Sequence, residues 1–245
     1  MNLAKLVRFS ATIATAASPA AHAQFWNPTT EFSTASNPND VWHYASLDAS
    51  LNGPLLLHPS FHSGVWWASG ARGEAHIWRN DRGSVAFGIA PGHLSLHPGN
   101  GFQASVLRWM NPNPSEPGTL TAQATFRPGD LGAMRVGVMV NGVLRFQALD
   151  SGSTTIVESN TSVESIDFVV WGGYSFGNTQ LEASISVNLD RCIGDFNRDG
   201  GVDGSDVVSF FEAWEAGEVG ADVNFSGGVD GSDVEAFFVR WEAGC

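Results

Sequence analysis

The chain has 245 residues, of which 43% are hydrophobic and 11% aromatic, and its formal net charge at pH 7 is −13. This length can bury one medium-sized core and one small one. The sequence holds no basic patch, which argues against nucleic acid as a partner. Twelve of the 25 acidic residues fall in residues 192–245, so the acidity belongs mainly to the end of the chain.

Residues 1–23 have the pattern of a secretory signal peptide. Lys5 and Arg8 give a positive start, a short and moderately apolar stretch follows, and Ala21-His22-Ala23 is a small-residue cleavage site before Gln24. We therefore expect export, to the extracellular space or the cell surface. A disordered N-terminal extension is the alternative. The sequence predicts no transmembrane span, because it contains no other long apolar run.

Residues 24–190 are typical of an all-β domain. Turn signals recur every 8–12 residues, for example Pro98-Gly99-Asn100-Gly101 and Pro128-Gly129. Apolar and polar residues alternate along residues 119–126, and Asn141-Gly142 between two apolar runs predicts a hairpin. We expect about ten short strands in a two-sheet antiparallel sandwich of the jelly-roll type.

One predicted strand of this domain presents polar groups beside a tryptophan. The faces of residues 72–80 alternate, so that Ala75 and Ile77 suit a core and the opposite face carries hydrogen-bonding side chains. Indole rings stack on the C–H faces of sugars, and such polar groups bind their hydroxyls. The pattern predicts a carbohydrate-binding face formed by Arg72, Glu74, His76 and Trp78. The alternative is an ordinary solvated sheet face with tryptophans in the core.

Trp66-Trp67 adds two aromatic residues, of which only one can point inward from a strand. His93 and His97 share a strand face, and a transition-metal site at these two residues is conceivable. No H-E-x-x-H motif or Cys/His spacing supports it, so the sequence favours two ordinary surface histidines. A glycoside hydrolase would need two carboxylates facing a cleft, and Glu74, Asp81 and Asp167 are available without any pattern that pairs them. The sequence therefore assigns no catalytic residue, and enzymatic activity stays an open alternative.

Residues 192–245 contain two copies of a calcium-loop pattern, which start at Asp195 and Asp222. Oxygen-bearing side chains fall at loop positions 1, 3, 5, 9 and 12, and Gly at position 6 permits the sharp turn around the ion. Asp203 and Asp230 at position 9 are expected to act through water. The pattern predicts two Ca²⁺ ions, held by Asp195, Asn197, Asp199, Gly201 and Asp206 in the first loop and by Asp222, Asn224, Ser226, Gly228 and Asp233 in the second.

Each loop leads into one amphipathic helix. Apolar residues at helical spacing run from Val207 to Trp214 and again from Val234 to Trp241, which places four on one face of each helix. Ser205 and Ser232 are candidate N-caps, and Gly217 and Gly244 are candidate C-terminal stops. The two helices are expected to bury their Phe and Trp faces against each other.

This double loop-and-helix pattern resembles the type I dockerin module, with an aspartate at position 12 of each loop. The resemblance covers residues 192–245 and implies Ca²⁺-dependent folding and docking to a cohesin-type or cell-surface protein. It also implies attachment to a secreted polysaccharide-processing protein. Positions 10 and 11, where dockerins usually carry recognition residues, hold Gly-Ser in both repeats.

Cys192 and Cys245 bracket this module. A bridge between them would close about 54 residues and stabilise the fold by on the order of 4 kcal/mol in the chain-entropy model. Two free thiols, or an intermolecular bridge through Cys245, are the alternatives.

Short segments of residues 24–190 are similar to secreted bacterial sandwich domains, namely Asn37–Tyr44, Leu96–Gly99 and Leu107–Trp109. That similarity implies a non-catalytic, carbohydrate-binding-like domain. The sequence thus favours a secreted binding or accessory protein with a dockerin-like tail. A polysaccharide-degrading enzyme (an O-glycosyl hydrolase) and a structural extracellular surface protein remain the alternatives.

Overall fold

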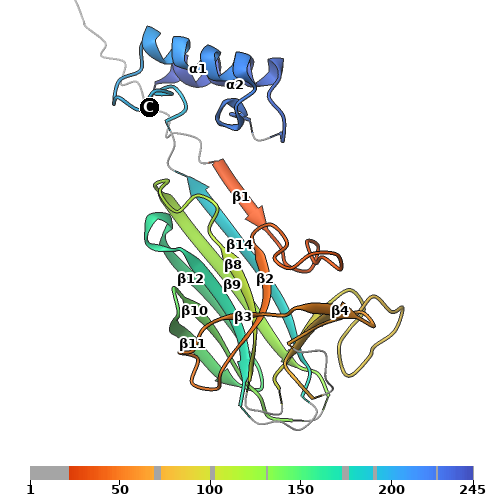
Figure 1. The fold of residues 1–245 in the computed structure, drawn as a ribbon. Coiled ribbons are helices and arrows are strands. Elements are labelled where there is room, and N and C mark those ends of the chain that lie inside the picture. Colours follow the sequence, from red (N-terminus) through yellow and green to blue (C-terminus); the bar gives the residue numbers. More distant parts are fainter. Residues whose placement is uncertain are drawn as a thin grey trace, which may run out of the picture. The chain divides into compact units, whose positions relative to one another are not determined.

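The structure is a computed structural model that describes residues 22–68, 73–99, 103–130, 132–172, 177–189, 192–224 and 226–244 (Figure 1). The chain divides into two compact units between residues 190 and 191, and each is described by itself. Most of the predicted signal peptide lies outside the described residues. None of the helices in the described ranges is long and apolar enough to cross a membrane.

The first unit consists of two antiparallel sheets, as the alternating pattern predicted. The larger sheet has the strand order β12 (Gly152–Ser159), β9 (Gly118–Pro128), β14 (Thr179–Leu189), β7 (Leu94–His97), β6 (His76–Arg79), β5 (Val65–Trp67) and β4 (Ser60–His62), and β1 (His22–Trp26) also pairs with β14. The smaller sheet has the order β11 (Val143–Leu149), β10 (Arg135–Val140), β13 (Ser165–Trp171), β8 (Ala104–Met110), β2 (Trp42–Leu47) and β3 (Leu56–Leu57).

Strand β1 begins inside the predicted leader. His22 and Ala23 pair with the end of β14, and Gln24 pairs with Val187. Cleavage before Gln24 would therefore shorten β1 and keep the pairing of residues 24–26.

The inward faces of both sheets form one core, because side chains alternate between the two faces of a strand. Leu120, Ala122, Ala124 and Phe126 of β9 are buried there, as the alternation predicted. The largest fully buried side chains include Trp42, Trp109 and Phe168 from the smaller sheet. The predicted hairpin is confirmed, since β10 and β11 pair through Asn141 and Gly142, which both have positive φ.

The second unit contains helices α1 (Gly204–Ala216) and α2 (Gly231–Ala243), with a 3₁₀ turn at Val219–Ala221 between them. Phe210 of α1 and Phe237 of α2 are fully buried and stack with ring centroids 4.2 Å apart and an interplanar angle of 1°. The predicted burial of one helix face against the other is confirmed by this core, which Ile193, Ala221 and Val223 complete.

The predicted N-caps of the two helices were wrong, whereas the predicted C-terminal stops were right. The N-caps are Asp203 and Asp230, whereas Ser205 and Ser232 lie inside the first turn. Each Asp accepts a hydrogen bond from the main-chain N–H two residues later, which is the usual satisfaction of a free donor at a helix start. The predicted stops at Gly217 and Gly244 are confirmed as C-caps.

Candidate functional site

The candidate site lies on the outer face of the larger sheet, over strands β4 to β7. The register places Trp67 opposite His76 and His76 opposite His97. Their neighbours Trp66, Ile77 and Leu96 point the other way, into the core. Strand alternation therefore gathers one row of aromatic side chains on the outside of the sandwich.

The rings of this row stack across the strands. Trp67 and His76 have ring centroids 4.7 Å apart, and His76 and His97 have centroids 4.4 Å apart with planes inclined by 15°. His62 of β4 extends the row, since its ring stacks on Trp67 at 5.5 Å. We call His62, Trp67, His76 and His97 the aromatic row.

The Trp66-Trp67 pair divides between the two faces, as predicted for adjacent strand residues. Trp66 is 5% exposed and stacks on Tyr44 in the core at 5.6 Å, and its indole N–H donates to the Ser33 carbonyl. Trp67 is partly exposed on the outer face. Only Trp67 of this pair can therefore contact a ligand on that face.

A pocket of about 510 Å³ opens beside the aromatic row. Its lining is more apolar than polar, with a few converging polar groups, as in sites for small organic ligands. The lining consists of Ser63, Gly64, Val65, Trp67, Gly73, His76, Trp78, Arg79, Asp81, Arg82, Phe87, His97, Asp130 and Asn178.

Two of the four side chains predicted for the sugar face line this pocket, namely His76 and Trp78. Glu74 is not among the lining residues, and its Oε2 is buried without a hydrogen-bond partner. Arg72 lies outside the described residues. Trp78 is only 7% exposed and packs against Ala86 and Ile89, so most of its ring supports the pocket wall from behind.

A polar network forms one side of the pocket. Asn178 Oδ1 accepts hydrogen bonds of 2.9 Å from the Trp78 indole N–H and from the Ser95 hydroxyl. The main-chain N–H of Asn178 donates to Asp130 Oδ1 at 2.7 Å, and its amide nitrogen donates to the same oxygen at 3.1 Å. The loops after β9 and before β14 therefore fix the position of the Trp78 ring.

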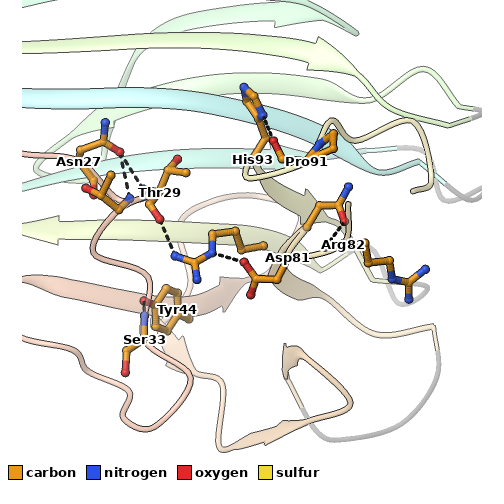
Figure 2. A network of polar contacts seen from close by, with 11 residues as sticks. Asn27, Thr29, Ser33, Tyr44, Asp81, Arg82, Pro91 and His93 are labelled. Carbon is orange, nitrogen blue, oxygen red and sulfur yellow. Dashed lines mark hydrogen bonds and ion pairs between the residues drawn. The ribbon is translucent and has the colours of Figure 1, made fainter. Parts of the chain in front are cut away.

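A second group of charged residues forms another part of the wall. The Arg79 guanidinium donates to Asp81 Oδ1 at 2.6 Å and to the Thr29 carbonyl at 2.9 Å, contacts that are drawn in Figure 2. Arg82 lies next to Asp81, and its guanidinium carbon is 5.9 Å from the centre of the Phe87 ring. Cations and anions thus alternate along this wall.

Phe87 stands at the tip of a tight turn. Phe87 and Gly88 both have positive φ, and Ala86 and Ile89 exchange both main-chain hydrogen bonds, as in a type I′ turn. A bulky residue rarely adopts this conformation. The turn holds the 58%-exposed Phe87 ring edge-on to Trp78, at 5.9 Å between centroids.

Two histidines of the row, His76 and His97, are held in their neutral form. Burial and, to a smaller extent, the nearby His97 together lower the pKa of His76 to about 4, although the hydrogen bond to the Glu74 carbonyl opposes the shift. The pKa of His97 is also lowered, mainly by burial, although the Pro98 carbonyl and Asp130 oppose the shift. A neutral imidazole has one donor and one acceptor. The Nδ1–H of His76 donates to the Glu74 carbonyl and that of His97 donates to the Pro98 carbonyl, so at neutral pH His76 presents its Nε2 as an uncharged acceptor.

The three carboxylates considered for hydrolysis do not come together as a pair in this pocket. Asp167 is fully buried in β13 and forms a two-pronged ion pair with Arg108 at 2.6 and 2.8 Å. Asp81 is the one of the three that lines the pocket. The second lining carboxylate is Asp130, which sequence reasoning missed.

The two histidines considered for a transition metal are also separated. They are four residues apart on an extended strand, a distance of about 13 Å. His97 stacks on His76, whereas His93 Nε2 lies 3.6 Å from Glu182 Oε1. In the described part of the chain, no three His, Cys, Asp or Glu side chains form a group that could hold a metal ion.

The two predicted calcium loops fold alike. Asp195 Oδ1 and Oδ2 accept main-chain N–H groups of Asp199 and Gly200 at 3.1 and 3.0 Å. Asp222 accepts those of Ser226 and Gly227 at 3.0 and 2.9 Å. Gly200 and Gly227 at position 6 have φ of 92° and 91°, a conformation that favours glycine.

The aspartates at position 12 are fully buried. Asp206 accepts the main-chain N–H groups of Asn197 and Asp203, and Asp233 accepts those of Asn224 and Asp230. The donor atoms available in each loop are carboxylate, amide and main-chain oxygens, a set that fits a hard cation such as Ca²⁺. Since no group of three carboxylates gathers there, amide and carbonyl oxygens would supply the remaining ligands.

Asp203 and Asp230, which the sequence predicts to bind calcium through water, are also the N-caps of the two helices. Asp203 Oδ1 accepts both the N–H and the hydroxyl of Ser205 at 2.7 Å. These bonds lower the pKa of Asp203, and the equivalent bonds from Ser232 lower that of Asp230.

The predicted Cys192–Cys245 bridge stays a prediction, because Cys245 lies outside the described residues.

No family model and no curated protein matches the chain. Among solved structures, it is similar to CBM35 from Paenibacillus barcinonensis, with 16% identity and a TM-score of 0.29 over 51% of this chain and 93% of the other. It is also similar to the K1 cleaved adhesin domain of Lys-gingipain from Porphyromonas gingivalis, with 11% identity and a TM-score of 0.32 over 58% of this chain and 96% of the other. A third similar structure is CBM29_1, a family 29 carbohydrate-binding module from Piromyces equi, with 12% identity and a TM-score of 0.30 over 68% of this chain and 91% of the other.

The pocket residues that sequence reasoning missed include Phe87, Asp130 and Asn178. Asn178 and Asp130 are 100 and 52 residues away from Trp78 in the sequence, and only the pairing of β14 with β9 and β7 brings them to it. The turn at Phe87-Gly88 was the one available signal, since a glycine in a short apolar run marks a turn.

Proposed function

We propose that residues 24–190 form a non-catalytic carbohydrate-binding domain of a secreted accessory protein, a sandwich of the jelly-roll type. One observation carries the proposal: a row of stacked aromatic rings borders a pocket of about 510 Å³ that also presents amide, carboxylate and guanidinium groups. Sugars need this combination, because their C–H faces stack on aromatic rings and their hydroxyls pair with planar polar groups.

The exposed part of Trp67 is the stacking surface in this proposal. Trp78, His97 and Asn178 form the floor and wall. The Nδ1–H of neutral His76 donates to the Glu74 carbonyl, so this ring supplies its Nε2 as an acceptor at neutral pH. The concave shape favours a single polysaccharide chain or a short oligosaccharide over the flat surface of a crystalline polymer.

A glycan array with the full chain tests this function. The proposal expects a small set of related glycans to bind, and it fails if none binds at millimolar concentration. Incubation of every bound glycan with the protein, followed by chromatography of the products, separates binding from hydrolysis. Product formation that Asp81→Asn or Asp130→Asn abolishes would replace the proposal with the alternative of a polysaccharide-degrading enzyme.

We further propose that residues 192–245 form a dockerin-like module that binds two Ca²⁺ ions and docks to a cohesin-type or cell-surface protein outside the cell. The repeated loops of oxygen donors around Gly200 and Gly227, and the small shared Phe core, support this proposal. Such a small core needs further stabilisation, which bound ions would give.

Chelation tests the calcium role. Removal of Ca²⁺ should abolish the helical circular dichroism of residues 192–245 while the sandwich stays folded. Calorimetry that detects no Ca²⁺ binding to the full chain would contradict it. Calcium-dependent capture of the chain by immobilised cohesin domains would support docking, and capture that is equal with and without chelator would count against it.

A further inference from the structure

The two tryptophans of the helical unit make crossed hydrogen bonds between the repeats. The indole N–H of Trp214 in α1 donates to the main-chain carbonyl of Asp230, and that of Trp241 in α2 donates to the carbonyl of Asp203. Both distances are 2.8 Å. The sequence pattern placed these residues on apolar helix faces and gave no indication of the two bonds.

Each acceptor is position 9 of a loop and also the N-cap of a helix. The Asp203 carbonyl accepts the main-chain N–H of Asp206 as well, and the Asp203 N–H donates to Asp206 Oδ2 at 2.8 Å. Trp241 therefore holds the peptide group that also orients the buried carboxylate at position 12. Trp214 has the same relation to Asp230 and Asp233.

Packing alone would not impose this arrangement. The Phe210–Phe237 stack joins the helices by contacts between rings, which have little directional preference for a particular carbonyl group. A hydrogen bond, in contrast, requires a defined distance and angle. Each indole thus connects the end of one helix to the start of the other.

We infer that Trp214 and Trp241 are positioning residues, each for the calcium loop of the other repeat. The inference rests on the proposed calcium binding. Loss of the indole N–H of Trp214 weakens the loop that starts at Asp222, and loss of that of Trp241 weakens the loop that starts at Asp195.

The test uses the full chain with one loop inactivated, so that calorimetry with CaCl₂ reports a single site. Asp195→Ala leaves the second loop, and Asp222→Ala leaves the first. Trp214→Phe and Trp241→Phe are then made in both backgrounds, since Phe keeps the apolar ring and removes the N–H. The two tryptophans serve as matched controls for each other.

The expected pattern is crossed. Trp214→Phe should lower the affinity about three- to tenfold with only the second loop active and leave the first loop unchanged, and Trp241→Phe should do the reverse. This range corresponds to a net hydrogen bond of about 0.7–1.4 kcal/mol. An effect on the same repeat, or equal effects on both loops, would overturn the inference. Absence of binding in the parent chain would instead contradict the calcium proposal itself.

A second measurement needs no tryptophan variant and covers the case in which those variants unfold. Two-dimensional NMR of the Asp195→Ala chain should show that Ca²⁺ slows hydrogen exchange of the Trp214 indole N–H more than that of Trp241. The Asp222→Ala chain should show the opposite order. The same order in both chains would overturn the inference.

Discussion

The imidazole rings of His76 and His97 stack with centroids 4.4 Å apart and planes inclined by 15°, on two neighbouring strands of the larger sheet. Two imidazolium ions at this separation would repel each other, and burial adds to the cost of charging either ring. The stack is therefore stable only with neutral rings, and the stability of the sandwich depends on pH.

Stability should fall on acidification through this pair. The pKa of His76 is about 4 in the folded protein and close to 6.5 in the unfolded chain, so the unfolded chain binds more protons between these values. The stabilising contribution is fully present above about pH 6.5 and is lost as the pH falls toward 4. Calorimetric melting at pH 7 and pH 4.5, with saturating Ca²⁺, should show a smaller drop in Tm for His76→Phe than for the parent. Equal drops would contradict this assignment.

The Phe87 turn should be sensitive to a single methyl group. A Cβ at Gly88 would overlap the main-chain carbonyl group of Gly129, and the φ of 75° already favours glycine. Gly88→Ala should destabilise the sandwich by at least about 1–2 kcal/mol and weaken glycan binding, because the turn must move. Gly83→Ala is the matched control, since a Cβ there meets no atom within 4 Å. Denaturant unfolding and glycan titration check both variants, and equal behaviour of the two would refute the role of the turn.

The N-cap aspartates should matter to helix stability through their side chains. Asp203→Ala removes the acceptor for the Ser205 N–H, whereas Asp203→Asn keeps an oxygen in the same place. The alanine variant should melt on the order of a few degrees lower by helical circular dichroism. The asparagine variant should stay close to the parent. Equal losses for the asparagine and alanine variants would contradict the cap role and would show that the charge of the carboxylate matters instead.

Calcium affinity should differ between the loops. Position 5 is Asp199 in the first loop and Ser226 in the second, and the neutral hydroxyl removes one unit of attraction to the ion. The second loop should therefore empty first when a chelator is added. Calorimetry should show two affinities in the parent and a narrower gap in Ser226→Asp. Two equal affinities in the parent would contradict this difference.

The sequence predicted the sheets well because burial on one face of a strand leaves a period of two. That period identified the inward residues of β9 and the partition of Trp66 from Trp67. It also placed His76 and Trp78 on the outer face. It could not show that the Trp78 ring is mostly buried there, because the loop at Ala86–Ile89 covers it through contacts that no strand pattern encodes.

The helical unit shows the same division. Apolar spacing predicted both helices and their shared Phe core, since a period near 3.6 places those residues on one face. The caps were predicted two residues too late, because Ser and Asp are both good N-cap residues and both occur at each helix start. The crossed tryptophan bonds had no signal, because they depend on how the two repeats face each other.

Trp67→Ala is the variant that tests carbohydrate binding most directly. Trp67 borders the pocket and is partly exposed, so its loss should remove the stacking surface with little change in Tm. Trp78→Ala is less informative, because burial of this ring predicts a loss of about 3–5 kcal/mol in stability.

The decisive measurement is calorimetric titration of the full chain with a glycan that binds on the array. Phe25→Ala is the control, because Phe25 is an exposed aromatic residue of β1 that does not line the pocket. We expect at least a tenfold loss of affinity for Trp67→Ala, about 1.4 kcal/mol, and parental affinity for Phe25→Ala. Parental affinity of a folded Trp67→Ala chain would contradict carbohydrate binding in this pocket.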